Sequence, residues 1–384
     1  MERTLQSLLT HSFTRYSQQH ALPGRVYNAA WSLINCRTAR LGGHTQYCPH
    51  GHVERVWYNS CKHRSCPQCN GLSTERWLEK QKTRLIDCPH YHIIFTLPHE
   101  LNVLWQYNRA SMEQLLFSAV SASLKTLCVD GPYLAGEPGF ICALHSWGRS
   151  LTLHPHIHCL ITDGGLTAQG QWQRPKKSCL LPGRVVSALF RGKMLAEIKQ
   201  QHLTTPMRLP PTVTSQALSN LLNRLGRKKW HVYVQQRYAH GEGVLIYLSR
   251  YLRGGPLANL QIQAIDATTI RYRYYSHKNN ATQALTLSHD AFLTRYFWHV
   301  PTKGRQLVRY YGLYANGKRS RLASAQCIDG GVKPSSKTTL TWQAYLKRLG
   351  IAAQRYQCPV CGSELHTRPI TARQQGPPAV KARH

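Results

Sequence analysis

The chain has 384 residues, 42% of them hydrophobic, so it is long enough for two or three domains and apolar enough to build a large core. Lys and Arg number 49 against 16 Asp and Glu, and this net charge of +33 predicts a polyanionic partner, nucleic acid ahead of an anionic membrane. So few acids argue against nucleases that hold paired metal ions with three carboxylates.

Aromatic and cysteine content refine this picture. The 20 Tyr and 9 Trp suit stacking on unpaired bases, although a basic protein with a merely solvated surface is the alternative. No apolar run approaches the roughly 20 residues of a membrane span, and no signal peptide opens the chain. We therefore expect a cytoplasmic protein whose 13 Cys are reduced, some of them holding metal.

Residues 5–40 have the apolar spacing of two helices separated by a turn at Pro23 and Gly24. Residues 36–70 are rich in Cys and His, and a Cys-x-x-Cys pair there precedes a helical pattern, which is a strong zinc-knuckle signal. Thiolates with imidazole select zinc over oxygen-preferring ions. The candidate ligands are Cys48, His50, Cys61, Cys66 and Cys69, with His52 as an alternative to His50.

The spacing does not decide which four residues bind. Cys36, set earlier on a helix, is assigned to the core. Free thiols in a small core are the alternative to zinc.

Residues 153–162 read as a strand, in which side chains alternate between two faces. Ile157 and Cys159 then share an apolar face, and His156 and His158 stand side by side on the other. Two imidazoles on one strand form half of a metal site, since imidazole is the commonest metal ligand. Hydrogen-bonded core histidines are the alternative.

Residues 140–147 form a second strand, joined to the first by a few residues, so an antiparallel hairpin is predicted. His145 can then face the same metal as a third ligand. The same patterns predict strands at 91–97, 228–234 and 270–275, and helices at 100–128, 185–202, 214–225 and from a Ser288 N-cap.

Glycines bracket a short predicted helix in residues 241–256. Tyr247 and Tyr251 lie four apart, hence on one face, with Arg250 and Arg253 nearby. Taken alone, such a pair is ordinary packing. Beside a histidine metal strand in a strongly basic protein, it suggests nucleophiles.

Residues 302–321 are dense in Lys, Arg and Tyr, which suits phosphate contacts and base stacking, with a solvated basic loop as the alternative. The DNA-binding candidates are Arg250, Arg253, Lys303, Arg305, Arg309, Tyr310, Tyr311, Lys318 and Arg319. Further on, Cys358 and Cys361, with His366 five residues later, form a possible second zinc knuckle without an obvious fourth ligand, and a disordered tail is expected from residue 367.

A tyrosine hydroxyl can attack phosphorus when a divalent ion binds the phosphate and neutralises the developing charge. The product is a phosphotyrosine that conserves the bond energy and leaves a 3′-hydroxyl. Two tyrosines allow a second strand to be attacked while the first stays covalent.

The His156–His158 pair resembles the histidine–hydrophobic–histidine motif of the HUH endonucleases, and Tyr247 with Tyr251 resembles the two-tyrosine signature of their rolling-circle transposases. More specifically, the chain resembles the insertion-sequence-91 family over almost its whole length. The matching stretches are Asn59–Cys69, His92–Leu101, His145–Gly148, His154–Cys159, Tyr247–Tyr251 and Val308–Gly312. One departure is Cys48-Pro-His50-Gly-His52, where the family usually has Cys-x-x-Cys.

This resemblance implies an α+β fold with a central antiparallel sheet, a ferredoxin-like HUH core, and flanking helices. It also implies an N-terminal zinc-binding region, cleavage of single-stranded DNA at the ends of the chain's own element, and a 5′-phosphotyrosine intermediate supported by Mg²⁺ or Mn²⁺. The expected domains are residues 1–88 (helices and Zn²⁺), 89–315 (catalysis) and 316–384 (a basic extension). A bacterial protein associated with the nucleoid follows from this interpretation.

Two alternatives use the same residues differently. A plasmid replication initiator or relaxase would share the chemistry, but the match to transposases along the chain argues against it. A zinc-dependent DNA-binding regulator would explain the charge and the Cys pairs, but it leaves His156, His158 and the tyrosine helix without a role.

Overall fold

The computed structural model describes residues 2–175, 180–235, 237–252, 255–276, 279–328, 340–350 and 356–371, and at Tyr247, Arg250, Tyr251 and Leu252 it describes the backbone alone. Its helices and antiparallel sheets confirm the predicted α+β class. Among the described residues, no helix is long and apolar enough to cross a membrane.

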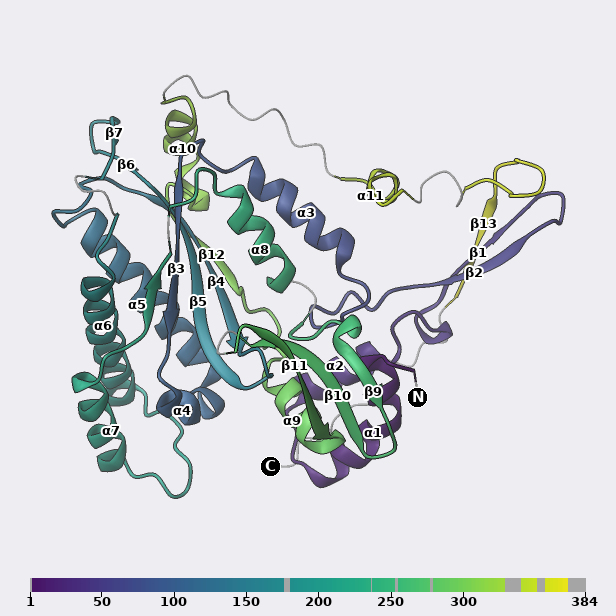
Figure 1. Ribbon diagram of the computed structural model, residues 1–384, viewed down its shortest axis with the longest axis horizontal. Coiled ribbons are helices and arrows are strands. Elements are labelled where there is room, and N and C mark those ends of the chain that lie inside the picture. Colours follow the sequence, from purple (N-terminus) through teal and green to yellow (C-terminus); the bar gives the residue numbers. More distant parts are fainter. Residues whose placement is uncertain are drawn as a thin grey trace.

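A five-stranded antiparallel sheet in the order β12-β4-β5-β3-β8 forms the centre of the molecule (Figure 1). β4 and β5 form the predicted hairpin, in which His145 lies opposite His156 and Ala143 opposite His158. The strands are β3 (His90–Thr96), β4 (Gly139–Trp147), β5 (Leu153–Thr162), β8 (Val232–Val234) and β12 (Val308–Gly312).

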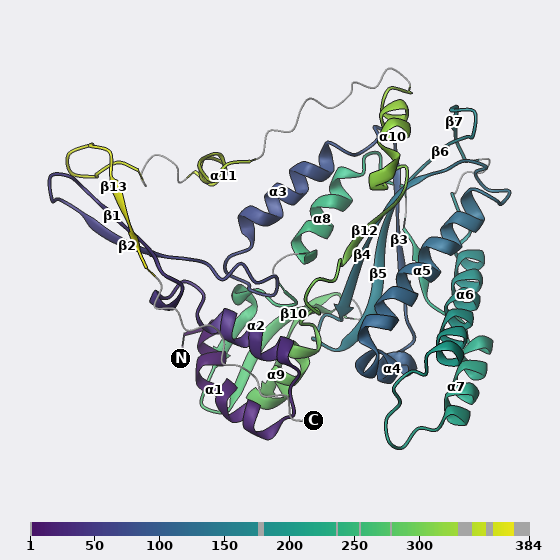
Figure 2. The same cartoon turned by 180° about the vertical axis from the view of Figure 1, so that it is seen from behind.

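Strand alternation gives this sheet two unlike faces. The face with Ile157 and Cys159 packs on one set of helices, and the face with His156 and His158 lies toward the other, so the helices flank the sheet on both sides (Figure 1, Figure 2). The first set comprises α4 (Asn102–Tyr107), α5 (Arg109–Cys128), α6 (Gly183–Thr204) and α7 (Ser215–Arg227), and the second α3 (Gly71–Lys82), α8 (Glu242–Leu252) and α10 (Arg319–Gln326).

One long helix was expected at residues 100–128, but two helices, α4 and α5, meet at Asn108. The Asn108 side chain accepts from the N–H of Arg208 at 2.7 Å and donates to its carbonyl at 2.7 Å. Asn108 makes this contact with a residue 100 positions away instead of adopting a helical conformation. No local sequence pattern predicts the contact.

A second hydrophobic cluster unites the N-terminal helices with elements from the second half of the chain. Ser12 of α1 lies 2.7 Å from His289 of α9, and Ser288 caps α9 as predicted. The cluster therefore cuts across the domain boundary expected at residue 88. Its elements are α1 (Leu5–Gln19), α2 (Gly24–Ile34), α9 (His289–Trp298) and the antiparallel strands β9 (Ile262–Ile265), β10 (Thr269–Ser276) and β11 (Ala281–Ser288).

A third sheet, β13-β1-β2, projects from the body on the side away from α6 and α7 (Figure 1, Figure 2). It joins β1 (Gly43–Tyr47) and β2 (Glu54–Tyr58) to β13 (His366–Ile370), and we call residues 43–58 and 356–371 the arm. β13 was expected to be disordered, and residues 372–384 of that expected tail lie outside the described residues. Further elements are the strands β6 (Gly165–Leu166) and β7 (Trp172–Gln173), the helix α11 (Trp342–Arg348), and short 3-10 helices at Ala39–Leu41, His99–Leu101, Asn259–Gln261 and Asn316–Lys318.

A buried ion pair fastens the second cluster to the central sheet's helices. Arg109 Nε lies 2.8 Å from Glu113 Oε1, and the side chains are 9% and 2% exposed. Arg109 also donates to the carbonyl of Trp298, the last residue of α9, at 2.6 Å.

We expect Glu113→Ala to lower the free energy of unfolding by about 3–5 kcal/mol, because it leaves a buried guanidinium without its counter-charge. Glu54→Ala is the matched control: its pair with Arg368 is also 2.8 Å long but exposed, so its loss should cost less than about 1 kcal/mol. Urea unfolding followed by circular dichroism measures both, and equal effects would contradict the role of the buried pair.

Candidate functional site

Three histidines meet where β4 and β5 pair. His156 and His158 leave the same face of β5, and His145 comes from the opposite position on β4. One ring nitrogen from each lies within 4.8 Å of the others. His145 and His158 are buried, whereas His156 is partly exposed and forms the solvent side of this triad.

Hydrogen bonds select the tautomers of two triad members. The Gln235 amide oxygen can only accept, so His92 Nδ1 donates to it at 3.0 Å. His92 Nε2 then accepts from His158 Nδ1 at 2.8 Å, so His158 Nε2 carries a lone pair and no proton. His156 Nδ1 donates to the His154 carbonyl at 2.7 Å, so His156 Nε2 carries a lone pair as well.

The two Nε2 atoms lie 3.0 Å apart. Two lone pairs at this distance repel unless a cation lies between them, and ligands at right angles around an ion with bonds near 2.1 Å are about 3.0 Å apart. Burial lowers the pKa of His156 to about 4 and the pKa values of His145 and His158 well below their ordinary value. Neutral imidazole is the ligand form, so the triad fits a divalent cation.

His92 was not singled out from the sequence as a site residue. Its signal is the alternation of His90 and His92 along β3, which puts His92 on the same face as its β5 neighbour Leu160 and the triad. The position of Gln235, in a loop far along the chain, has no such signal.

Helix α8, which carries both tyrosines, packs across the histidine face. Leu245 and Leu248 of α8 belong to one buried cluster with Ile141, Ala143 and Leu160 of β4 and β5. Lys82 at the end of α3 pairs with Glu242 at the start of α8 at 2.7 Å. The side chains of Tyr247, Tyr251 and Arg250, and the whole of Arg253, lie outside the described residues.

Four cysteines converge between α2 and α3: Cys36, Cys61, Cys66 and Cys69. Sγ–Sγ distances are 3.6 Å for Cys36 and Cys66 and 3.7 Å for Cys61 and Cys69. Tetrahedral zinc with Zn–S bonds near 2.3 Å separates its sulfurs by about 3.8 Å, so this set fits zinc. Contacts with Cys61 and Cys66 lower the pKa of the Cys36 thiol, and contact with Cys36 raises the pKa values of Cys61 and Cys66.

This grouping differs from the expected ligand set in two ways. Cys36, assigned to the core from its helical position, joins the cluster because the chain after α2 turns back beside the knuckle. Cys48 lies instead with His52, Cys358 and Cys361, and His50 belongs to neither group among the described residues. Spacing along the chain carries no information on either contact.

The residues expected to bind DNA have mixed positions. Lys303 and Arg319 are exposed and Arg305 is partly exposed. Lys318 lies 3.5 Å from Glu137. The candidates on β12 make contacts within the chain: Arg309 lies over the Phe117 ring, Tyr310 beside Trp77 and Arg84, and Tyr311 is stacked on Phe140.

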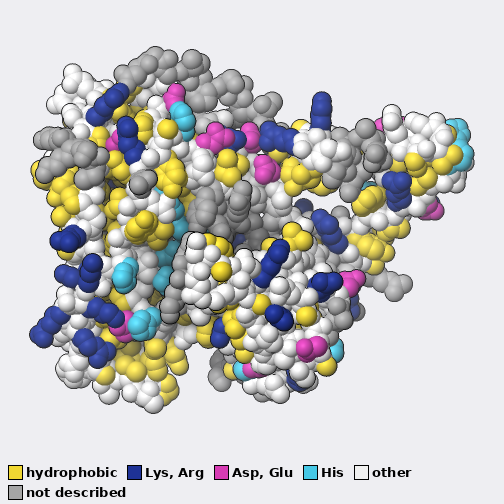
Figure 3. Space-filling model, in the orientation of Figure 1, with side chains coloured by type: hydrophobic (Ala, Val, Ile, Leu, Met, Phe, Trp, Pro, Cys, Tyr) yellow, Lys and Arg dark blue, Asp and Glu magenta, His cyan; other side chains and the backbone are white. Residues whose placement is uncertain are grey.

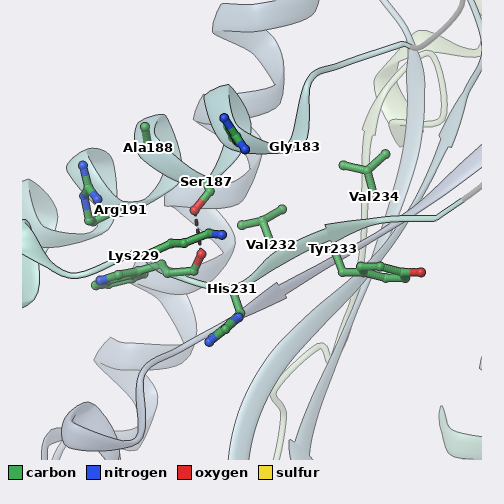
Figure 4. A pocket seen from close by; sticks show the side chains of 11 residues that line it. Gly183, Ser187, Ala188, Arg191, Lys229, His231, Val232, Tyr233 and Val234 are labelled. Carbon is green, nitrogen blue, oxygen red and sulfur yellow. Dashed lines mark hydrogen bonds between the residues drawn. The ribbon is translucent and has the colours of Figure 1, made fainter.

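A basic groove between α6 and the edge strand β8 was not predicted. Its lining includes Arg184, Arg191, Lys229, His231 and Tyr233. Val232 and Val234 point toward α6, while His231 and Tyr233 point the other way, and Ser187 bonds the Trp230 carbonyl at 2.7 Å (Figure 4). The groove lies in a region where Lys and Arg gather over α6 and α7 (Figure 3): residues 183–235 hold nine Lys and Arg and one acid, Glu197.

The groove lies on the α6 side of β8, but the side chain of Tyr233 points to the face of the sheet that carries the triad. Tyr233 lies opposite Ile94, which lies opposite His158, so these side chains point to the same side. Two strand spacings, about 10 Å, separate Tyr233 from His158. Two sequence signals could have revealed the basic groove: the spacing of Arg184 and Arg191, seven apart on α6, and the adjacent pair Lys228 and Lys229.

Comparison with known proteins defines the class. Residues 139–321 match a family model described as a putative transposase, and residues 8–97 match a transposase zinc-binding domain. The putative transposase y4qJ of Sinorhizobium fredii is 32% identical, over 90% of this chain and 89% of its own. The transposase for insertion sequence element IS801 of Pseudomonas savastanoi pv. phaseolicola is 32% identical, over 87% of this chain and 81% of its own.

The chain therefore belongs to the insertion-sequence-91 family of transposases with an N-terminal zinc-binding domain. This confirms the family expected from the motifs, and with the cysteine cluster it supports a structural zinc. A solved structure of TrwC complexed with a 27-mer DNA matches 41% of this chain and 71% of its own, with 13% identity and a TM-score of 0.23. A score this low supports no conclusion about the fold.

We expect Gln235→Leu to weaken Mn²⁺ binding by about 10–100-fold, because the outer hydrogen bonds that hold a histidine ligand's tautomer and orientation contribute this much to metal affinity. Gln216→Leu, at an exposed residue of α7 whose amide donates to Asn220 at 3.1 Å, is the control. Isothermal titration calorimetry measures the Mn²⁺ affinity of both variants. An unchanged affinity in Gln235→Leu would show that the hydrogen bond between Gln235 and His92 does not support metal binding.

Proposed function

We propose that this transposase cleaves and rejoins single-stranded DNA at the ends of its own element by tyrosine transesterification, in rolling-circle transposition. The observation that supports this most is the neutral histidine triad on the sheet face across which α8, with Tyr247 and Tyr251, packs. Membership of a transposase family favours this programme over plasmid replication or relaxation.

His145, His156 and His158 would hold the cation. A Mg²⁺ or Mn²⁺ ion bound there supplies positive charge that polarises the scissile phosphate. The triad members are neutral imidazoles, which add no negative charge to offset that of the cation.

Tyr247 or Tyr251 is the nucleophile. Its hydroxyl oxygen bonds to the scissile phosphorus as the bond from phosphorus to the 3′ oxygen breaks, and the tyrosine proton passes to the released 3′ oxygen, which becomes a hydroxyl. The 5′ phosphate stays on the tyrosine as a diester, so rejoining needs no energy source. A second tyrosine one helical turn away lets another strand be cut before the first is released.

The basic groove is our proposed path for the DNA strand. Lys229 and Arg184 contact the phosphates, and the ring of Tyr233, 63% exposed, offers a stacking surface on the histidine face. The path would thus run from the α6 side of β8 around this edge strand to the histidine face.

A denaturing gel with labelled single-stranded ends of the element and Mn²⁺ tests the chemistry. We expect a covalent protein–DNA adduct with wild type, less with Tyr247→Phe or Tyr251→Phe alone, and none with the double variant or with His156→Ala. Tyr107→Phe, at an exposed tyrosine on α4, should keep the adduct. Tight binding without any adduct in wild type would instead favour the zinc-dependent regulator.

Salt titration of binding to the same oligonucleotides tests the path. For single strands each phosphate contact contributes about 0.7 to the slope of log K against log salt, so Lys229→Ala with Arg184→Ala should lower the slope by about 1.4. Tyr233→Ala should weaken binding about 5–150-fold, because stacking contributes about 1–3 kcal/mol per base. Lys347→Ala, exposed on α11, is the charge control, and equal slopes in both charge variants would place the DNA elsewhere.

A further inference from the structure

A second set of ligand-type residues remains without a role in the proposed chemistry. Cys48 and His52 belong to the β1–β2 hairpin, and Cys358 and Cys361 to the turn before β13. The matched zinc-binding domain covers residues 8–97, so half of this set lies outside it.

The distances in this set are those of a tetrahedral zinc site. Cys48 Sγ lies 3.6 Å from Cys361 Sγ and 3.6 Å from His52 Nδ1, and all four donor atoms lie within 4.8 Å of one another. Zn–S bonds near 2.3 Å and Zn–N bonds near 2.05 Å give about 3.8 Å between sulfurs and about 3.6 Å between sulfur and nitrogen. A disulfide would need about 2.0 Å.

Both turns have the backbone of a metal knuckle. Gly51 and Gly362 adopt positive φ angles of 76° and 74°, and their N–H groups donate to the carbonyls of Cys48 and Cys358 at 2.9 Å and 2.8 Å. The N–H of His50 donates to Cys48 Sγ at 3.4 Å, which stabilises a thiolate. Each turn wraps around its own first cysteine, so two half-sites face each other.

The arm has almost no apolar core of its own. Its buried hydrophobic cluster is Cys48, Cys358 and Leu365, with Val53 packed beside them. β2 alternates between exposed and partly buried residues, and β13 is exposed except for its last residue. A small sheet with so little burial is not stable by hydrophobic contacts alone, and metal coordination is the usual substitute.

We propose that Cys48, His52, Cys358 and Cys361 bind a second Zn²⁺ ion, which pins residues 356–371 to the β1–β2 hairpin and thereby builds the arm. The ion joins ligands 313 positions apart in the chain. β13 then pairs with β1, from Gly43 opposite Ile370 to Tyr47 opposite His366. The zinc ion thus joins the β1–β2 hairpin and residues 356–371 into one structural unit. Neither the Cys-x-x-x-His pair of the hairpin nor the Cys-x-x-Cys pair before β13 is a complete site by itself.

Zinc content of the purified full-length protein tests the stoichiometry. We expect about two zinc ions per chain in wild type and about one in Cys361→Ser, with the first cluster still loaded. Cys69→Ser should also hold about one, and the double variant close to none. Cys327→Ser, an exposed cysteine outside both sets, should keep two. One ion in wild type, or two in Cys361→Ser, would overturn the proposal.

Hydrogen–deuterium exchange separates a shared site from two independent knuckles. His52→Ala changes only the hairpin, yet we expect it to raise exchange at residues 366–370 to that of an unpaired strand while α5 and β4 stay protected. Unchanged protection of residues 366–370 would overturn the proposal that one zinc ion joins the two segments of the arm. Neither measurement uses DNA or cleavage, so failure here is distinct from failure of the proposed function.

Discussion

The pairing of β4 with β5 is the constraint on which the histidine site depends. Because side chains alternate along a strand, a slip of one residue would move His156 and His158 to the face that α5 and α6 cover. Ile157 and Cys159, both fully buried against those helices, hold the register from the other side. The apolar face of β5 thus fixes the position of its histidine face. The same register places His145 of β4 opposite His156.

The electrostatics of the site and of the surface complement each other. The triad consists of neutral nitrogen ligands, and burial keeps them neutral. A cation held by such ligands retains its full charge toward a phosphate, whereas carboxylate ligands would offset part of it. Acidic residues are also few on the surface: the whole chain has 16 Asp and Glu, and the α6–α7 region is therefore positively charged. A backbone of phosphates therefore meets positive charge first on the surface and then, in our proposal, at the triad.

The two cysteine-containing clusters differ in the hydrophobic burial around them. The four-cysteine cluster links the end of α2 to the start of α3, and Tyr296 of α9 donates to the neighbouring Ser65 carbonyl at 2.7 Å. Cys36 and Cys66 are at the same time part of the second hydrophobic cluster. That site borders a large hydrophobic core, whereas the hydrophobic cluster of the arm has four members, which is why we assign a metal the larger share of the arm's stability.

Short-range patterns determined much of this protein from the sequence alone. Alternation over residues 153–162, a short connection to residues 140–147 and the Ser288 cap predicted the hairpin, the shared face of His156 and His158, and the start of α9, because these depend on neighbours in the chain. The motifs identified the family. What only the tertiary structure decided are contacts between distant segments: Cys36 with the knuckle, Cys48 with Cys361, His92 and Gln235 behind His158, and α1 against α9. Spacing cannot encode these, since each arises from how packed elements bring remote residues together, and the geometry of that packing is absent from any local pattern.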